Sequence, residues 1–293
     1  MLSFITWSVD PEIFSLGPFP IRYYSLLFVA AFAANIYIFN RFFKRDKLPI
    51  ELLDTLIMWA FISTILGLRL GHCFFYEPAY YLAHPLEIIL PVRFQPTFEW
   101  IGLQGLASHG AAIGVPLGLY LFCRKYKMRY LWLLDRIVIV VALTGFFIRL
   151  GNLMNSEVYG VQTSLPWGFI FEQRGEVVPK HPTQIYESLA YLVIFFVLMF
   201  IFQKKENLRN RGGFLFGLFL VLTFTFRFFV EFIKEVQVDF EQGMALDMGQ
   251  LLSIPFVLLG VGLIAYSFKH EPSSKPFVGN ASYPPAGAKK KKK

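Results

Sequence analysis

Charged residues are scarce in this chain of 293 residues, making up 16% of it, whereas hydrophobic residues make up 55%. A soluble globular domain carries about 25% charged residues, so the composition excludes that class and favours a membrane protein. The formal net charge is +8, but the five lysines at positions 289–293 supply five of these charges. The remaining excess of three gives little support to a nucleic-acid-binding protein, and we expect no nucleic-acid partner.

Cysteine is also rare, because Cys73 and Cys123 are the only two in the sequence. Both lie in or at the end of apolar segments, without the spacing that metal ligands show, so neither a disulfide framework nor a zinc site is expected. We accordingly predict no metal and no cofactor. The first twenty residues lack a basic segment and contain Asp10, Pro11 and Glu12, so a cleavable signal peptide is not expected.

Long apolar segments take the place of charge. A transmembrane helix needs about 20 apolar residues, and the segments that qualify are residues 23–42, 52–74, 100–124, 131–150, 184–202, 213–232 and 248–268. Helices satisfy all their backbone groups within lipid, so the sequence predicts an all-α polytopic membrane protein with seven transmembrane helices. We expect one membrane domain over residues 1–268 and a disordered basic tail over residues 269–293. The final lysines suit a solvated tail or attraction to anionic lipid.

Basic residues are concentrated in alternate loops. The loops after the first, third and fifth segments hold Arg41, Lys44, Arg45 and Lys47, then Arg124, Lys125, Lys127 and Arg129, then Lys204, Lys205, Arg209 and Arg211. The intervening loops hold only Arg93, then Arg174 and Lys180, then Lys234. Short loops rich in Lys and Arg stay in the cytoplasm. The pattern therefore predicts the N-terminus outside and the C-terminus in the cytoplasm.

Polar groups gather at the predicted outer ends of the helices, although ionisable groups inside a bilayer are costly. They are Arg22 and Tyr24, Arg69 and His72, His109, Arg149 and Asn152, Gln184, Tyr186 and Glu187, and Arg227 and Glu231. We place His109 about 14 Å into a helix that starts near Trp100. Two arginines in a low-dielectric site favour an anion, and guanidinium matches phosphate as a bidentate fork. These residues predict a site for a phospholipid headgroup in the outer leaflet.

Structural roles also suit these residues one by one. Arg227 and Glu231 are four apart on one helix face and suit an ion pair. Arg149 suits a side chain that snorkels to the interface, His109 a buried hydrogen-bonded imidazole, and Tyr24 an aromatic belt. Pairing with neighbouring groups is the role expected of two further residues, Arg69 and Asp135. Such roles do not explain why two arginines, a histidine and amides converge on one leaflet.

The clearest local pattern runs from Arg149 to Gly160 and reads RLGNLMNSEVYG. Arg149 and Asn152 share a helix face, Glu157 suits an arginine or an amide as partner, and Gly151 and Gly160 permit close backbone approach. The pattern resembles the signature of the prolipoprotein diacylglyceryl transferases, bacterial enzymes that begin lipoprotein maturation. The resemblance extends over residues 7–268 through WSVDPEIFSLG at 7–17, SHG at 108–110, HPTQIYE at 181–187, RFFVE at 227–231 and MGQLLS at 248–253.

Four positions depart from the family pattern. Ile148 and Ala111 stand where the family has Gly, and Leu153 stands where it has Phe. We expect these three to alter only packing. Thr223 stands one turn before Arg227, where better-known members carry Tyr, so a hydroxyl remains but a phenol does not.

The resemblance implies transfer of the diacylglyceryl group from phosphatidylglycerol to the lipobox cysteine thiol of a prolipoprotein. A thioether forms and glycerol phosphate leaves. The implied catalytic residues are His109, Arg149, Arg227 and Glu231, with His109 as the thiol base, the two arginines as a phosphate clamp and Glu231 orienting Arg227. The implied headgroup contacts are Tyr24, Arg149, Asn152, Glu157, Gly160 and Arg227. The implied supporting residues are Gly110, His181, Gln184 and Glu187.

The resemblance also implies a location and partners. We expect a monomeric multi-pass protein of the bacterial inner membrane, with its active site toward the periplasmic leaflet. Its partners would be phosphatidylglycerol, the prolipoprotein signal peptide with its lipobox cysteine, and membrane lipids. A transporter or scramblase-like binder of anionic lipid would use the same arginines without forming a covalent product. The sequence shows no internal repeat of the transporter kind, which argues modestly against that alternative.

Overall fold

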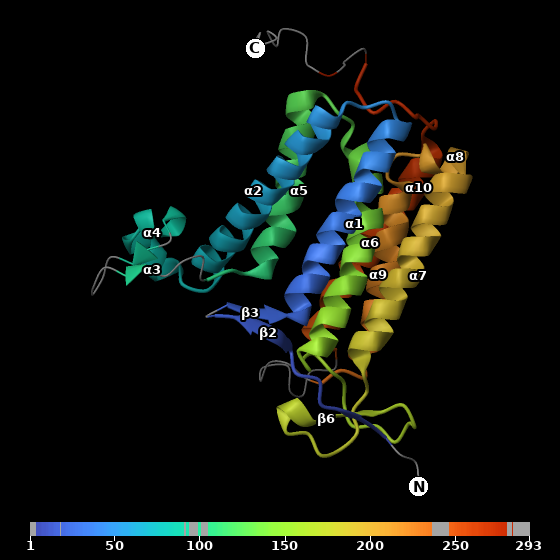
Figure 1. Ribbon diagram of the computed structural model, residues 1–293. Coiled ribbons are helices and arrows are strands. Elements are labelled where there is room, and N and C mark those ends of the chain that lie inside the picture. Colours follow the sequence, from blue (N-terminus) through green and yellow to red (C-terminus); the bar gives the residue numbers. More distant parts are fainter. Residues whose placement is uncertain are drawn as a thin grey trace. The chain divides into compact units, whose positions relative to one another are not determined.

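The computed structural model describes residues 4–17, 19–90, 92–93, 99–100, 105–235, 246–279 and 283. The chain divides into two compact units. The first comprises Met1–Phe42 and Leu131–Ser274, and the second comprises Phe43–Tyr130 and Lys275–Lys293. Helices make up most of both units (Figure 1).

Five long helices form the first unit: α1 (Tyr23–Arg45), α6 (Tyr130–Met154), α7 (Thr183–Lys204), α9 (Phe214–Glu231) and α10 (Met248–Lys269). A buried apolar cluster joins four of them through side chains such as Phe42 of α1, Ile139 of α6, Leu198 of α7 and Leu215 of α9. Close packing of these large side chains holds the helices together, because lipid tails are as apolar as the side chains and burial away from lipid adds little by itself. The cluster fixes the positions of the helix ends that carry the polar residues.

Short strands cover the end of the first unit at which α1, α7 and α10 begin. β1 (Ile5–Trp7) pairs in parallel with β6 (Phe169–Phe171), and β2 (Glu12–Leu16) pairs antiparallel with β3 (Phe19–Arg22), which leads into α1. The turn η1 (Glu172–Arg174) follows β6, and α8 (Glu206–Arg209) follows α7. The indole Nε1 of Trp7 donates to the carbonyl of Leu153 at 3.1 Å, which ties the N-terminal segment to the end of α6.

The second unit is built on α2 (Ile50–Phe75) and α5 (Ser108–Tyr126), with α3 (Pro78–Ala83), α4 (Leu86–Ile89) and the antiparallel pair β4 (Val92–Arg93) and β5 (Glu99–Trp100) between them. Gly110 of α5 packs on α2 so closely that a Cβ there would lie 2.0 Å from the Gly67 carbonyl oxygen. Arg69 is buried, donates its Nε to the Ile88 carbonyl at 3.0 Å and lies over the Tyr81 ring. The prediction that Arg69 pairs with neighbours is confirmed.

Six helices are long and apolar enough to cross a membrane, namely α1, α2, α6, α7, α9 and α10. Each coincides with a segment predicted from the sequence, so the prediction of a helical polytopic membrane protein is confirmed. The remaining predicted segment, residues 100–124, corresponds to α5, which does not belong to this set of six within the described residues. Seven spans therefore stay a prediction.

The start of α5 corrects the expected depth of His109. Gly105 has a φ of 68° and Ala107 is extended, so the backbone becomes helical only at Ser108. His109 is thus the second residue of α5 and is exposed, and the prediction that it lies about 14 Å into a helix is wrong. Sequence hydropathy missed this because the residues before Ser108 are apolar enough to extend the helical pattern.

Part of the predicted tail is ordered within the second unit. The N–H of Arg129 donates to the Pro276 carbonyl at 2.8 Å, and the N–H of Val278 donates to the Lys127 carbonyl at 2.9 Å. The prediction of disorder is wrong for this stretch, because its backbone pairs with the loop after α5. The five terminal lysines lie outside the described residues.

Asp135 joins two helices of the first unit. Its side chain is 1% exposed, and its two carboxylate oxygens accept hydrogen bonds from the N–H groups of Gly213 at 2.7 Å and Phe216 at 2.8 Å. A carboxylate at a helix N-terminus satisfies donors that have no partner within the helix. The prediction that Asp135 pairs with neighbouring groups is confirmed, and its partners are the first N–H groups of α9.

We predict that Asp135→Ala lowers the free energy of unfolding by about 1–3 kcal/mol, because two buried N–H groups lose their acceptor. Asp54, which is exposed on α2, provides the control, and Asp54→Ala is expected to change stability much less. Thermal unfolding of both variants in detergent measures the difference. Equal stability of the two variants would contradict a capping role for Asp135.

Candidate active site

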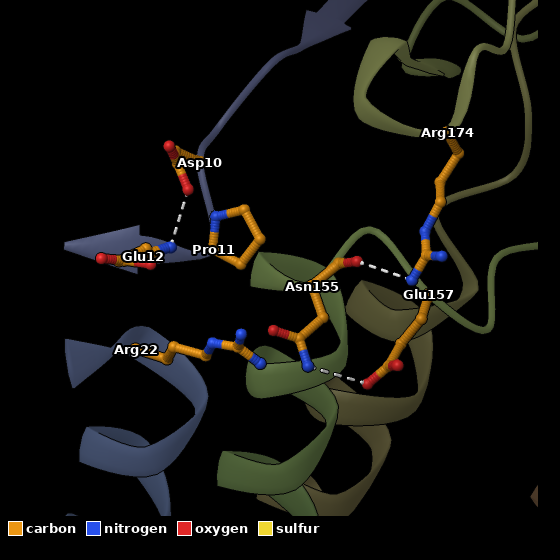
Figure 2. A pocket seen from close by; sticks show the side chains of 7 residues that line it. All are labelled: Asp10, Pro11, Glu12, Arg22, Asn155, Glu157 and Arg174. Atoms are coloured by element: carbon orange, nitrogen blue, oxygen red, sulfur yellow. Dashed lines mark hydrogen bonds between the residues drawn. The ribbon is translucent and has the colours of Figure 1, made fainter. Parts of the chain in front are cut away.

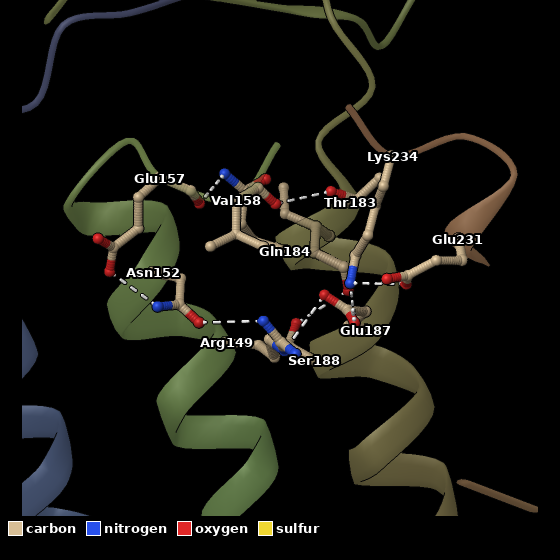
Figure 3. A network of polar contacts seen from close by, with 11 residues as sticks. Arg149, Asn152, Glu157, Val158, Thr183, Gln184, Glu187, Ser188, Glu231 and Lys234 are labelled. Atoms are coloured by element: carbon tan, nitrogen blue, oxygen red, sulfur yellow. Dashed lines mark hydrogen bonds and ion pairs between the residues drawn. The ribbon is translucent and has the colours of Figure 1, made fainter. Parts of the chain in front are cut away.

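A polar network lies at the end of the first unit where α6 ends and α7 begins (Figure 3). Its labelled members are Arg149, Asn152, Glu157, Val158, Thr183, Gln184, Glu187, Ser188, Glu231 and Lys234. The residues among them that the sequence predicted are Arg149, Asn152, Glu157, Gln184, Glu187 and Glu231. The folded chain therefore brings together side chains from α6, α7, α9 and the loops that follow α6 and α9.

Glu157 orients the amide side of the network. Its Oε1 accepts from Asn152 Nδ2 at 2.8 Å and from Asn155 Nδ2 at 3.1 Å. Because the Asn152 nitrogen is held by Glu157, its Oδ1 faces Arg149 and accepts from Nη1 at 3.4 Å. The sequence predicted an arginine or an amide as the partner of Glu157, and in the structure its partners are amides. Asn152 contacts Arg149 as expected.

The loop that carries Glu157 is held by the start of α7. Gln184, which is fully buried, donates its Nε2 to the Glu157 carbonyl at 2.8 Å, and Thr183 Oγ1 donates to the Val158 carbonyl at 2.9 Å. Val158 has a φ of 60°, a conformation that β-branched residues rarely adopt. The two hydrogen bonds from α7 stabilise a backbone that is unfavourable on its own.

Alternating charges make up the other side of the network. Glu187 is 3% exposed, with its Oε2 at 3.2 Å from Arg149 Nε and its Oε1 at 3.0 Å from Lys234 Nζ. Lys234 Nζ lies 3.2 Å from Glu231 Oε2. The structure thus pairs Glu231 with Lys234, and within the described residues no ion pair joins Glu231 to Arg227. The expected pairing of Glu231 with Arg227 is wrong, because Lys234 occupies the carboxylate.

Arg227 lies beside this network, and no ion pair joins it to a carboxylate among the described residues. It lines a small cavity of about 10 Å³ with Glu187, Tyr191 and Thr223. Arg149 and Arg227 both lie close enough to Tyr191 to act on it electrostatically. Glu187 is paired with Arg149 and Lys234, and Glu231 is paired with Lys234, so Arg227 is the guanidinium of the two without an ion pair among the described residues. Two neighbouring guanidinium groups of this kind favour an anion with several oxygens, such as phosphate.

Thr223 faces the same cavity from α9. It is buried, and its hydroxyl has no hydrogen-bond partner in the part of the chain that the structure describes. The hydroxyl is therefore available to a ligand in the small cavity that Thr223 shares with Arg227.

Tyr24 and Gly160 reach the network by close packing. A Cβ on Gly151 would lie 2.6 Å from the Tyr24 ring, so this glycine lets the ring approach α6, near Glu157 and Arg149. Gly160 donates its N–H to the His181 carbonyl at 2.8 Å, and a Cβ on it would lie 2.2 Å from the Ile233 carbonyl oxygen. Glycine is thus required at position 160 because two loops approach each other closely there.

The side chains of the other predicted residues form no hydrogen bond or ion pair with the network among the described residues. His181 is partly buried, with its Nδ1 at 3.3 Å from the Tyr186 hydroxyl, and burial lowers the pKa of its imidazole. His109 and Gly110 belong to the second unit, at the start of α5. In the part of the chain that the structure describes, no group of three or more His, Cys, Asp and Glu side chains is placed to hold a metal ion.

A larger cavity adjoins the Glu157 side of the network (Figure 2). It measures about 340 Å³ and is lined by Asp10, Pro11, Glu12, Arg22, Asn155, Glu157 and Arg174. Arg174 donates Nε to the Ser156 carbonyl at 3.0 Å and Nη2 to the Asn155 carbonyl at 3.2 Å, which fixes the far wall. Glu157 and Asn155 thus belong to both the cavity and the network.

Sequence reasoning missed Lys234, Tyr191 and Asn155 as members of the site. Lys234 was read only as a loop charge, because it follows the apolar segment that forms α9. The signal that would have found it is its spacing of three residues from Glu231. Tyr191 sits one turn after Glu187 on α7, but an aromatic residue in an apolar segment carries no distinguishing pattern.

Comparison with known proteins identifies the family to which the chain belongs. The family described as "Prolipoprotein diacylglyceryl transferase" matches residues 11–266. The chain belongs to the prolipoprotein diacylglyceryl transferase family. It is 47% identical over 264 residues to a phosphatidylglycerol–prolipoprotein diacylglyceryl transferase of Bacteroides fragilis, covering 89% of this chain and 94% of the relative. Transferases with the same description from Tolumonas auensis and Porphyromonas gingivalis are 43% and 41% identical and cover 90% and 93% of this chain and 98% of each relative.

We predict that Gly160→Ala lowers the free energy of unfolding by about 1–3 kcal/mol, because its methyl group would overlap the Ile233 carbonyl and push two loops apart. Gly262→Ala is the matched control, since a Cβ at Gly262 meets open space. Thermal unfolding in detergent compares the two variants. A Gly160→Ala variant as stable as Gly262→Ala would show that the close approach is not required.

Proposed function

We propose that the polar network of the first unit binds the phosphate of phosphatidylglycerol while the diacylglyceryl group is transferred. The activity itself follows from the family: the chain catalyses phosphatidylglycerol–prolipoprotein diacylglyceryl transfer in lipoprotein maturation. The observation that carries the placement is that Arg149 and Arg227 both lie near Tyr191, and that no ion pair joins Arg227 to a carboxylate among the described residues. The substrate phosphate would be the ion-pair partner that Arg227 lacks there.

The chemistry assigns a task to each arginine. The sulfur of the lipobox cysteine attacks the glycerol carbon that bears the phosphate, a C–S bond forms, and the C–O bond to phosphate breaks. The bonding electrons leave with glycerol phosphate, so negative charge grows on the phosphate oxygens. Arg149 and Arg227 stabilise that charge, which is the kind of interaction that lowers the barrier most when donors are held in place beforehand. Glu187 and Asn152 hold Arg149 in place.

The glycerol end of the headgroup fits the larger cavity. Its hydroxyl groups need acceptors, and the carboxylates of Asp10, Glu12 and Glu157 line the cavity wall. Arg22 adds a positive charge on the same side, which suits the released phosphate. Because Glu157 belongs to both places, a headgroup with its phosphate at Arg149 would direct its glycerol into this cavity. The carboxylates that line this cavity would then select a lipid whose headgroup carries glycerol hydroxyl groups.

His109 is the proposed base for the thiol proton. Histidine is the side chain whose charge changes nearest neutral pH, and the thiolate rather than the thiol is the nucleophile. His109 is exposed at the first turn of α5, so its imidazole is open to a substrate or to a bridging water.

The membrane arrangement completes the proposal. With α5 as the seventh span, the basic loops lie in the cytoplasm, the N-terminus outside, and residues 1–268 form the catalytic domain. In the first unit, α6 and α9 end and α1, α7 and α10 begin near the network, as this alternation requires. The active site then faces the periplasmic leaflet of the bacterial inner membrane. In this proposal the protein acts as a monomer, with phosphatidylglycerol and a prolipoprotein signal peptide as its partners.

We predict that Arg149→Ala and Arg227→Ala each lower diacylglyceryl transfer by about 10²–10³-fold, because each removes one donor to the developing charge. Mass spectrometry of a short lipobox peptide with phosphatidylglycerol in detergent detects the added diacylglyceryl unit. Arg41→Ala, an exposed arginine of α1, is the control and is expected to retain full transfer. If the wild-type protein bound phosphatidylglycerol but left the peptide unmodified, the result would favour a lipid transporter or scramblase-like binder instead.

We predict that His109→Asn lowers the transfer rate by about 10²–10⁴-fold at neutral pH, because the thiol loses its base. The deficit should narrow toward pH 9, since a thiol with a reference pKa near 8.5 then ionises in solution. Rates measured from pH 6 to pH 9 test this, with His84→Asn in the same unit as control. A His109→Asn variant with full turnover at pH 7 would remove the histidine from this role.

A further inference from the structure

Lys234 is a buried lysine held between two carboxylates. It is 8% exposed, and its Nζ lies 3.0 Å from Glu187 and 3.2 Å from Glu231. A buried charge is costly unless it is well paired, so a lysine at this position needs both partners. No step of the proposed chemistry uses Lys234, which raises the question of what its charge does there.

The ion pairs around Lys234 do not include Arg227. Arg149, Glu187, Lys234 and Glu231 form a chain of alternating charges in which each carboxylate contacts a cation. Arg227 is left with a positive charge for a ligand. Glu231 lies four residues after Arg227 on the same helix face, the spacing at which opposite charges pair. Without Lys234, the Glu231 carboxylate would be free to pair with Arg227. Arg227 would then be neutralised by its own helix.

The backbone holds Lys234 in this place. Lys234 forms an isolated antiparallel bridge with Gly160, and the N–H of Val161 donates to the Ile233 carbonyl at 2.9 Å. The absence of a side chain on Gly160 allows this approach, since a Cβ there would lie 2.2 Å from the Ile233 carbonyl oxygen. The signature glycine of the loop after α6 thus positions the lysine that follows α9.

We propose that Lys234 is a positioning residue that occupies Glu187 and Glu231, so that Arg227 stays free for the phosphate of the lipid substrate. The proposal rests on the phosphate clamp of Arg149 and Arg227 described above. Lys234 touches neither the lipid nor the thiol in this account. It acts through the two carboxylates.

The first test replaces the charge at nearly constant length. Lys234→Met should raise the KM for phosphatidylglycerol and lower kcat/KM by at least tenfold, while Lys234→Arg should retain most of the activity. Lys234→Met/Glu231→Gln should recover at least half of the lost kcat/KM on a logarithmic scale, because the carboxylate that captures Arg227 is gone. A double variant no better than Lys234→Met would overturn the proposal, as would wild-type kinetics of Lys234→Met.

Lys180 provides a matched control. It is also a lysine between two carboxylates, with its Nζ at 3.4 Å from Glu176 and paired with Glu235. Among the described residues, neither of these ion pairs involves a side chain of the network. Lys180→Met should leave the KM for phosphatidylglycerol unchanged. An equal rise of KM in Lys180→Met would show a general loss of structure and would overturn the positioning role.

The outcomes separate this proposal from the function on which it rests. Full transfer by Arg149→Ala and Arg227→Ala would remove the phosphate clamp itself. Loss of transfer in those variants, together with wild-type kinetics of Lys234→Met, would remove only the role of Lys234. If Lys234→Met does not accumulate as folded protein, Lys234→Gln, which keeps a donor without the charge, supplies the same comparison.

Discussion

The carboxylate of Glu187 is the contact on which the rest of the site depends. One of its oxygens meets Arg149 and the other meets Lys234, so a single buried group connects α6, α7 and the segment after α9. A buried carboxylate between two cations is stable only when both are present. The geometry of Arg149 and the charge state around Arg227 therefore follow from one residue of α7. Asn152 adds the second restraint on Arg149, and it is held in turn by Glu157.

Two glycines make this arrangement possible, because the absence of a side chain lets neighbouring groups approach closely. Gly151 admits the Tyr24 ring, and Gly160 admits the backbone before Lys234. Both glycines lie in the segment from Arg149 to Gly160, so the segment serves two purposes. Its polar side chains belong to the polar network, and its glycines let two other parts of the chain approach that network. A substitution at a glycine would therefore change activity through displacement rather than through lost chemistry.

The helices and most polar residues were predictable because their physical signals are strong and local. Apolar length located α1, α2, α6, α7, α9 and α10, and the motifs located Arg149, Asn152, Glu157 and Glu187. The start of α5 was not predictable, since it depends on the positive φ of Gly105 rather than on hydropathy. Two basic residues had helical spacing from Glu231, Arg227 four residues before it and Lys234 three residues after it, and spacing alone does not choose between them. The structure pairs Glu231 with Lys234.

The central claim is that Arg149 and Arg227 together hold the phosphate of the lipid substrate. The most direct measurement is an experimental structure of the protein in lipid nanodiscs that contain phosphatidylglycerol, obtained without a peptide substrate. The account predicts one lipid phosphate within hydrogen-bond distance of both guanidinium groups, with Lys234 still paired to Glu187 and Glu231. A bound phosphatidylglycerol whose phosphate contacts neither arginine would contradict the claim.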